Sequence, residues 1–449
     1  MRGAALAIFL AVPAVAADTP RFRLAMPEAV SAARSHSPSL KAAAEESAGF
    51  ADLSDERFAA LLPRVTLDGS YRYQAEVPNF SVGAGQPARP FGDHRATSLG
   101  PTVSWTLWDQ GSLYKSWRAQ KAQAASWDER RRLADRQAEL GARLAYVQVQ
   151  LSCEQLWALG GSLALAEAQY KEIDNRFKAG AASRIDTLSS HQDTLQRRKL
   201  FLQAQAELSA SLRELLRLIG RDEGRDLARP LDARVSTAAL TGMGEATLLV
   251  ELDGLDARQE ALIGVETAAL DASHPRVEIY ARQAESSRLS ASSLNASRGP
   301  VIRVQGRVSY DYPNGPVLES VTQKSVGLTA SLPLFEGRRT ARAVSERRHA
   351  AAAAESRRDL ASEEIRRDWG VARDELGSLR AQQAVDARSV AETEELSRLI
   401  YLSYKAGRSN YLDVQSANLR ELEAKVQAAR TRAQVLIRLA TLADLAVQG

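Results

Sequence analysis

RFKAGAASRIDTLS (residues 176–189) and SYKAGRSNYLDVQS (residues 403–416) are near-copies of one pattern, and each lies between two long segments of helical periodicity. In each copy an aromatic residue precedes Lys-Ala-Gly, and an aspartate follows the glycine after five further residues. A glycine can take the left-handed conformation that ends a helix, and a Ser or Asn three positions later can cap the next helix. We therefore predict two tight helix–turn–helix elements, with Asp186 and Asp413 near the start of the returning helices, where the helix dipole stabilises an acid.

The similarity extends over most of the chain. Pro38 recurs as Pro275, 237 positions later, whereas Gly180 recurs as Gly407, 227 positions later. The ten-residue difference falls in the loop between two predicted strands, where changes of length are tolerated. The chain is therefore predicted to be a tandem duplication, divided into a signal peptide (1–16), a first repeat (17–219), a linker or equatorial segment (220–244) and a second repeat (245–449).

Each half is predicted to contain a short helix, a pair of strands, a long helix and a second short helix. In the first half these elements cover residues 26–62, 64–73, 97–108, 110–178 and 183–219. In the second half the strands cover residues 301–312 and 325–334, and the long helix covers residues 337–405. A helix of 69 residues extends about 100 Å at 1.5 Å per residue.

Each predicted strand has one polar face and one apolar face. The candidate apolar-face residues are Val65, Leu67, Tyr71, Val103, Trp105, Val304, Val308, Leu328 and Leu332. Two hairpins could pack these faces together in a soluble α+β protein. Alternatively, several chains could pool their strands into a membrane barrel, because four strands are too few to close one alone. The strand length of 10–12 residues and the aromatic residues near the strand ends favour the barrel.

The N-terminus has the composition of a secretion signal. Arg2 precedes an apolar stretch, and Ala14-Val15-Ala16 forms a cleavage pattern, so the mature chain is predicted to leave the cytoplasm. No cysteine directly follows this site, which argues against an N-terminal lipid anchor, and Cys153 alone cannot form an internal disulfide. Lys and Arg total 59 against 55 Asp and Glu, an excess too small to suggest binding of nucleic acid.

The sequence gives little sign of catalysis. Its five histidines have no metal-ligand spacing, and it contains no phosphate-binding glycine loop, nucleophile elbow or zinc motif. We therefore expect no enzyme activity, no cofactor and no metal site. Energy for any transport would have to come from a partner.

The duplicated order, the two turns and the strand exits LWDQG (107–111) and LFEG (334–337) resemble the outer membrane efflux family, which is also called TolC-type. The resemblance covers about residues 24–445. It implies an α+β membrane protein: a homotrimer whose 12-stranded barrel lies in the outer membrane of a Gram-negative cell and continues as an α-helical coiled-coil tunnel through the periplasm. Such a protein is a passive exit duct of a tripartite efflux pump or a type I secretion system.

The implied partners are outer-membrane lipid, a periplasmic adaptor (membrane fusion protein) and an inner-membrane transporter. The alternative is a periplasmic coiled-coil structural or adaptor protein without a pore. Such a protein would not need four amphipathic strands of membrane-spanning length, so the strand pattern favours the duct.

The resemblance also implies roles for the two turns, which would form the periplasmic tip of the tunnel. Asp186 and Asp413 match acids that ring the lumen, although a second acid of the family is replaced here by Ser189 and Ser416. Alternatively, the two aspartates only stabilise the helix ends. The remaining candidate gate residues are Tyr404, which matches a tyrosine that holds the gate shut, its counterpart Phe177, which lacks the hydroxyl, and the possible salt-bridge partners Arg184 and Arg408.

The exposed turn residues are the implied contacts for the adaptor. They are Lys178, Ala179, Gly180, Lys405, Ala406 and Gly407. The two glycines must end their helices in any case, so helix termination alone is the alternative explanation for them.

Overall fold

The computed structural model describes residues 21–80, 89–90, 92–221, 249–256, 262 and 264–447. The predicted signal peptide and most of the predicted linker lie outside these residues. The chain divides into two compact units, and each combines residues from both halves of the sequence. We call residues 39–134 and 272–366 the sheet unit, and residues 1–38, 135–271 and 367–449 the turn unit.

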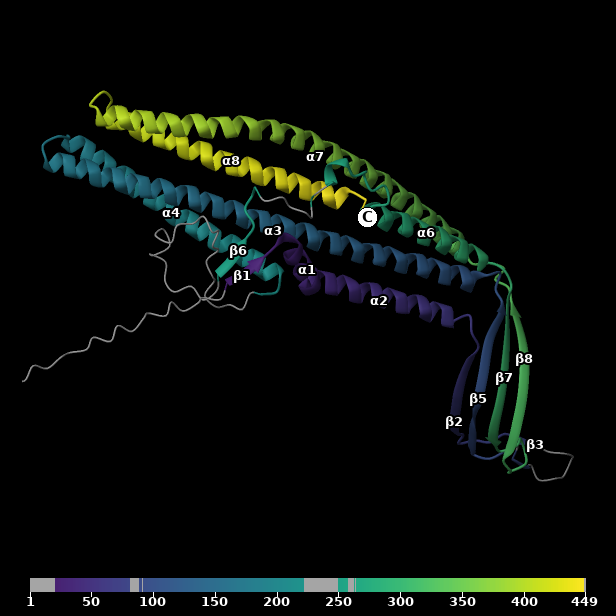
Figure 1. Cartoon of the computed structure of the whole chain (residues 1–449). Coiled ribbons are helices and arrows are strands. Elements are labelled where there is room, and N and C mark those ends of the chain that lie inside the picture. Colours follow the sequence, from purple (N-terminus) through teal and green to yellow (C-terminus); the bar gives the residue numbers. More distant parts are fainter. Residues whose placement is uncertain are drawn as a thin grey trace, which may run out of the picture. The chain divides into compact units, whose positions relative to one another are not determined.

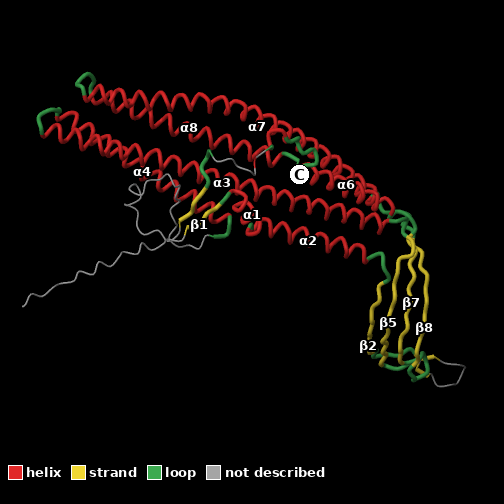
Figure 2. Tube along the Cα trace, in the orientation of Figure 1, coloured by secondary structure: helices red, strands yellow, loops and turns green. Residues whose placement is uncertain are grey.

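The sheet unit contains one antiparallel sheet with the strand order β2-β5-β7-β8 (Figures 1 and 2). Its strands are β2 (Arg64–Tyr73), β5 (Arg95–Trp108), β7 (Val301–Tyr312) and β8 (Val321–Ser331). Since the two hairpins pair edge to edge through β5 and β7, they form one continuous sheet. The alternative in which two hairpins pack their apolar faces against each other is therefore wrong, because the strands form one sheet.

The register places the apolar residues of all four strands on one face. Val65 is opposite Val103, Trp105 is opposite Val304, and Val304 is opposite Leu328. This face is open: the exposed fractions of Val65, Leu67 and Leu328 are 65%, 71% and 69%. Four neighbouring strands thus present a broad apolar surface that no described residue of the chain covers.

Helices α2 (Pro38–Ala59) and α6 (Pro275–Ala296) pack along the long helices within the sheet unit. The ring of Phe50 stacks on Trp127 of α3 (Ser112–Lys178) at a centroid distance of 4.4 Å. Arg276 of α6 lies 3.3 Å from Glu364 of α7 (Arg339–Lys405). These contacts join each short helix to the first part of a long one.

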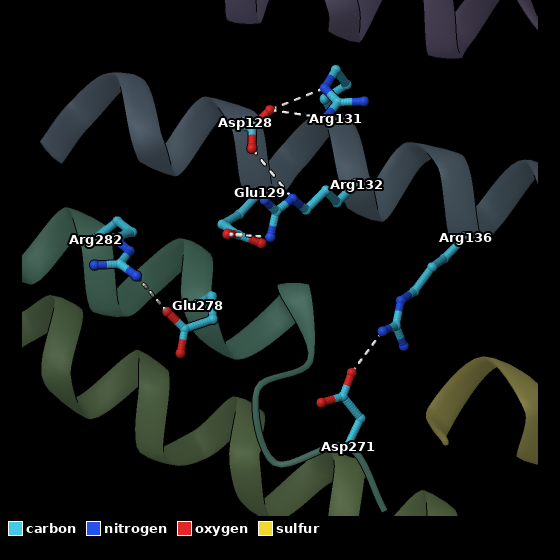
Figure 3. Close-up of polar contacts among 8 residues, drawn as sticks. All are labelled: Asp128, Glu129, Arg131, Arg132, Arg136, Asp271, Glu278 and Arg282. Atoms are coloured by element: carbon cyan, nitrogen blue, oxygen red, sulfur yellow. Dashed lines mark hydrogen bonds and ion pairs between the residues drawn. The ribbon is translucent and has the colours of Figure 1, made fainter. Parts of the chain in front are cut away.

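The basic run Arg130–Arg132 of α3 is partly neutralised by acids of the same helix (Figure 3). Arg131 and Arg132 form ion pairs with Asp128 at 3.0 and 3.2 Å, and Arg132 also pairs with Glu129 at 3.1 Å. Burial raises the pKa of the Glu129 carboxyl, while Arg132 opposes that shift. The remaining arginine of the run, Arg130, lies over the ring of Trp127 at 4.1 Å, so two of the three arginines are paired with acids.

The turn unit contains α1 (Met26–His36), α4 (Arg184–Leu218), α8 (Tyr411–Leu445), the 3-10 helix η2 (Val265–Thr267) and the later parts of α3 and α7. Strands β1 (Arg21–Leu24) and β6 (Leu249–Leu252) form a small parallel pair. The buried hydroxyl of Tyr146 in α3 donates to the carbonyl of Leu24 at 2.9 Å and accepts from the amide of Asp253 at 3.2 Å. In the same unit Arg136 forms an ion pair with Asp271 at 2.6 Å (Figure 3).

Most predicted boundaries lie within two residues of the observed ones, with two corrections. The predicted helix 26–62 is interrupted at Ser37, because the residue before a proline avoids the helical conformation and Pro38 starts α2. The last strand begins at Val321 and ends at Ser331, so Leu332 lies just beyond it. The loop predicted over residues 77–94 also contains the short paired strands β3 (Asn79–Phe80) and β4 (Arg89–Pro90).

The internal duplication is visible in the elements themselves. Helices α3 and α7 each have 67 residues, α4 and α8 each have 35, and α2 and α6 each have 22. The boundaries of the first two pairs differ by 227 positions and those of α2 and α6 by 237, as the sequence predicted. In the part of the chain that the structure describes, no helix is both long enough and apolar enough to cross a membrane.

Candidate functional site

The two turns have the same backbone geometry, and both lie at one end of the turn unit (Figure 2). Gly180 and Gly407 both have φ of +73°, in the left-handed region. The amide of Ala181 donates to the carbonyl of Arg176 at 2.7 Å, and the amide of Arg408 donates to that of Ser403 at 2.9 Å. This bond over five residues, combined with a left-handed glycine, forms a Schellman motif and confirms the predicted left-handed glycine at each helix end.

Both aspartates lie in the first turn of a returning helix. The hydroxyl of Ser183 accepts from the amide of Asp186 at 3.0 Å, and the side chain of Asn410 accepts from the amide of Asp413 at 2.9 Å. The Asp413 carboxylate also accepts from the amide of Asn410 at 3.2 Å, which completes a capping box. Asp413 is exposed and Asp186 is half-buried, so both carboxylates remain within reach of solvent while they stabilise a helix end.

The two helical hairpins meet in an aromatic cluster beside the turns. It consists of Ile173 from α3, Tyr404 from α7, and Tyr411 and Val414 from α8. The rings of Tyr404 and Tyr411 meet edge to face at 5.8 Å, and burial raises the pKa of both hydroxyls. The candidate gate residue Tyr404 is 8% exposed, so its ring is part of the packing between the hairpins.

A charged contact, which we call the α3–α7 clamp, lies next to this cluster. The hydroxyl of Tyr401 donates to one carboxylate oxygen of Glu172, and the ammonium of Lys405 lies 3.1 Å from the other. The same ammonium lies 4.7 Å from the centre of the Tyr401 ring. The hydrogen bond from Tyr401, followed by Lys405, lowers the pKa of the Glu172 carboxyl. The clamp therefore holds a charged carboxylate between α3 and α7 at neutral pH.

Further from the turns, buried polar side chains also join the hairpins. Asp193 and Arg197 of α4, which are 4% and 3% exposed, form an ion pair at 3.2 Å, and Gln415 of α8 donates to the same Asp193 oxygen at 3.4 Å. One turn along, Asn418 donates to Gln169 of α3 at 2.9 Å. Such buried polar contacts fix which residues of the two hairpins face each other.

The other candidate gate residues are more loosely held. Arg184 lies over the ring of Phe177 at 5.7 Å, whereas Arg408 is exposed. Neither arginine forms an ion pair with another residue that the structure describes. Lys178 pairs with Asp174 of its own helix at 2.6 Å. The remaining predicted adaptor contacts, Ala179, Gly180, Ala406 and Gly407, are all exposed at the turns.

The apolar sheet face is the second candidate surface. Tyr71, Tyr73 and Tyr310 are 66%, 63% and 60% exposed near the loop ends of their strands. At the opposite end, where the strands join the helices, the indole of Trp105 donates to the carbonyl of Leu61 at 2.9 Å. The outer edges of β2 and β8 pair with no further strand among the described residues. The other predicted apolar-face residues are at least partly exposed: Val103, Val304, Val308 and Leu332.

Sequence analysis did not identify Glu172, Tyr401, Asp193, Arg197 or Gln415. The spacing of Tyr401 and Tyr404, three residues apart on α7, was a usable signal that both rings share one helix face. The acidic partner of Tyr401 lies 229 positions away in the sequence, so no local pattern could indicate it.

Comparison with known proteins finds a family match to the first repeat and solved structures of the same fold. The sequence profile of the family described as outer membrane efflux protein matches residues 29–221. A solved membrane protein from Pseudomonas aeruginosa has a TM-score of 0.76 at 16% identity, with 94% of this chain and 93% of that chain covered. Residues 29–221, which cover most of the first repeat of this chain, are thus similar to the outer membrane efflux protein family.

Two further solved structures share the fold of this chain. The CmeC outer membrane channel of Campylobacter jejuni has a TM-score of 0.74 at 14% identity, with 94% of this chain and 85% of that chain covered. The MtrE outer membrane channel of Neisseria gonorrhoeae has a TM-score of 0.72 at 17% identity, with 94% and 88% covered. No curated protein sequence matches the chain. The TolC-like protomer fold thus extends over both repeats, beyond the segment that the family profile covers.

Proposed function

We propose that this protein is the outer-membrane exit duct of a tripartite efflux pump or type I secretion system, and that it acts as a passive conduit. The observation that carries the proposal is the exposed apolar face of a sheet with two open edges, in a chain whose residues 29–221 match the outer membrane efflux protein family. Exposed strand edges and large apolar patches are avoided by soluble monomers. Both are accounted for when the apolar face contacts lipid and each edge pairs with a neighbouring chain.

The number of strands supports a trimer. Four strands do not close a barrel, but β2 of one chain can pair with β8 of the next until the ring closes. Three copies give 12 strands, an even number within the range of outer-membrane barrels. In a closed barrel the backbone N–H and C=O groups of the β2 and β8 edges are hydrogen-bonded to neighbouring chains. Lipid cannot supply these hydrogen bonds.

The helical repeats support the same assembly. Leu422 and Ala429 of α8 are 6% and 3% exposed, because α8 packs on the first hairpin of its own chain. Their counterparts 227 positions earlier, Leu195 and Leu202 of α4, are 46% and 57% exposed. In a closed ring, every helical hairpin has a neighbour on the same side. The next chain would therefore cover the exposed stripe of α4 formed by Leu195 and Leu202. Leucines exposed near the end of α7 would supply the covering surface: Leu396, Leu399 and Leu402.

The turns form the proposed periplasmic gate and docking site. The α3–α7 clamp and the aromatic cluster hold the two hairpins of one chain together, while Arg184 and Arg408 are free to bridge to neighbouring chains. Asp186 and Asp413 from three chains would surround the opening with carboxylates, which attract cations and repel anions. The exposed Lys-Ala-Gly residues of both turns would contact a periplasmic adaptor that recruits the inner-membrane transporter.

A periplasmic adaptor without a pore is the second candidate. Such a protein has no use for an apolar sheet face that is mostly more than half exposed, so the sheet argues against it. Two measurements test the choice. The purified protein should be trimeric in detergent, and it should form discrete channels of uniform conductance in planar lipid bilayers. A stable monomer that forms no channels would favour the adaptor.

A further inference from the structure

The polar face of the sheet, opposite its apolar face, carries an uneven distribution of charge. The register places Arg64 opposite Ser104, and Ser104 opposite Gln305, so alternate residues of all four strands share this face. Its charged residues are four arginines and two aspartates: Arg64, Arg72, Arg303, Arg307, Asp68 and Asp311. Each chain therefore has an excess of two positive charges here.

Both acids of this face are engaged by neighbours. Asp311 accepts hydrogen bonds from Ser98 at 2.6 Å and from Ser309 at 2.9 Å. Asp68 accepts from Thr66 at 3.2 Å and lies within the electrostatic reach of Arg307. Arg307 is half-buried and donates to Ser98 at 2.8 Å. Asp68, Asp311 and Arg307 thus belong to one internal network, in which the charge of Arg307 opposes that of the acids.

Of the other three arginines, Arg64 also lies within electrostatic reach of Asp68, whereas Arg72 and Arg303 lie outside the network. Arg64, Arg72 and Arg303 are exposed, and none forms an ion pair with a residue that the structure describes. Arg64 and Arg303 occupy neighbouring rows where β2 and β7 begin, since Arg64 is opposite Ser104 and Arg303 is opposite Thr106. Arg72 lies near the other end of β2, opposite Ala96.

We propose that these arginines make the barrel lumen selective for anions, so that the preferred solutes are anionic or carry an anionic group. The inference rests on the proposed function, because only a closed barrel turns the polar face into a lumen. Three chains would place six guanidinium groups at the periplasmic mouth of the barrel, from Arg64 and Arg303, and three more further out. Rings of basic side chains select anions, and a guanidinium binds carboxylates and phosphates through two parallel hydrogen bonds.

The charge of the proposed barrel lumen is positive, whereas the aspartates at the turns are negative. The two surfaces belong to different units of the chain, so each can be altered separately. If the aspartates dominate ion selection, the whole channel prefers cations. If the barrel arginines dominate, it prefers anions. The measured preference therefore reports which region controls permeation.

The test is the reversal potential of channels in planar bilayers under a potassium chloride gradient. Low ionic strength is needed because the Debye length is about 10 Å at 0.1 M and shrinks with added salt. The wild type should favour chloride over potassium, and R64Q/R303Q should lower this permeability ratio at least about twofold. The control R95Q/K324Q also removes two positive charges, but from the apolar face of the same sheet, and should leave the ratio unchanged.

The wild type and each variant should also be measured in a background that carries Tyr401→Phe. This substitution weakens the α3–α7 clamp without changing charge, so that closure of the periplasmic tip does not hide the ion selectivity of the barrel. The inference of an anion-selective lumen would be overturned if the wild type selects cations, or if R64Q/R303Q leaves the chloride-to-potassium permeability ratio unchanged. The proposed channel function would stand in either case. Equal shifts in both double variants would overturn it too, because net charge rather than the lumen face would then be responsible. A well-folded protein that gives no channels in either background would instead overturn the proposed function.

Discussion

At the scale of single residues, Gly100 in β5 is where the sheet tolerates no side chain. A Cβ there would overlap the carbonyl oxygen of Val308 in β7 and lie 2.5 Å from the Cα of Ser309. Both are backbone atoms, so relief requires β5 and β7 to separate. Forcing an extra carbon into a packed site costs about 1–3 kcal/mol, and more when backbone must move. We expect Gly100→Ala to lower the yield and heat resistance of the trimer in detergent.

Gly327 in β8 provides the matched control for this prediction. A Cβ at Gly327 has nothing within 4 Å, and its backbone has ordinary strand geometry. Gly327→Ala should therefore leave trimer yield and heat resistance unchanged. If Gly100→Ala and Gly327→Ala lower trimer yield and heat resistance equally, the close approach of β5 and β7 at Gly100 is not the cause of the loss.

At the scale of elements, the α3–α7 clamp should control how firmly the two hairpins hold together. Tyr401→Phe removes the hydroxyl that donates to Glu172, and a hydrogen bond to a charged group contributes about 1.5–3 kcal/mol. The variant should therefore show higher mean conductance or more frequent opening in planar bilayers. Tyr411→Phe is the control, since the Tyr411 hydroxyl is buried without a hydrogen-bond partner among the described residues. If Tyr411→Phe opens the channel as much, general loosening of the aromatic cluster is the cause.

The same clamp predicts a pH dependence. In the clamped state the pKa of Glu172 lies below its ordinary value of 4.5, whereas a separated Glu172 returns to that value. The clamp is then fully effective above pH 4.5 and is lost as the pH falls through the lower, clamped pKa. Opening should increase on acidification below about pH 4.5 in the wild type. The Glu172→Gln channel should open more often at neutral pH and should show no further opening on acidification. If the wild type and Glu172→Gln respond to acid identically, other carboxylates cause the response.

Features that depend on residues close together in the sequence were predicted, whereas contacts between residues far apart in the sequence were not. Helix ends at Gly180 and Gly407 depend on local backbone geometry, so they were predicted correctly. The break at Ser37 was missed because the helical periodicity continues across it, although Pro38 marked the position. The order of β5 beside β7 and the clamp from Glu172 to Tyr401 join residues about two hundred positions apart. Such contacts depend on how the two repeats pack together, which local patterns do not contain.

At the scale of the whole molecule, the exposed stripe on α4 should hold the trimer together. Leu195 is 46% exposed in the single chain, and the proposed assembly buries it against the next chain. Leu195→Glu would place a charge in that apolar contact without affecting the core of its own chain. We expect a larger fraction of monomer in detergent by light scattering. Gln196→Glu adds the same charge at an exposed neighbouring position of α4 and should leave the trimer intact.

The two faces of the sheet should differ sharply in their tolerance of charge. Val304 of β7 lies between Trp105 and Leu328 on the apolar face, whereas the next residue, Gln305, lies on the polar face between Ser104 and Gly327. An arginine facing lipid costs about 2–4 kcal/mol at the bilayer midplane, while one facing a lumen is solvated. Val304→Arg should therefore reduce assembly into the outer membrane, measured as folded trimer in membrane fractions, and Gln305→Arg should assemble normally. Because the two positions are adjacent on one strand, local strand propensity cannot explain a difference between them. Equal assembly of both variants would mean that the apolar face does not contact lipid, and the barrel would have to be abandoned.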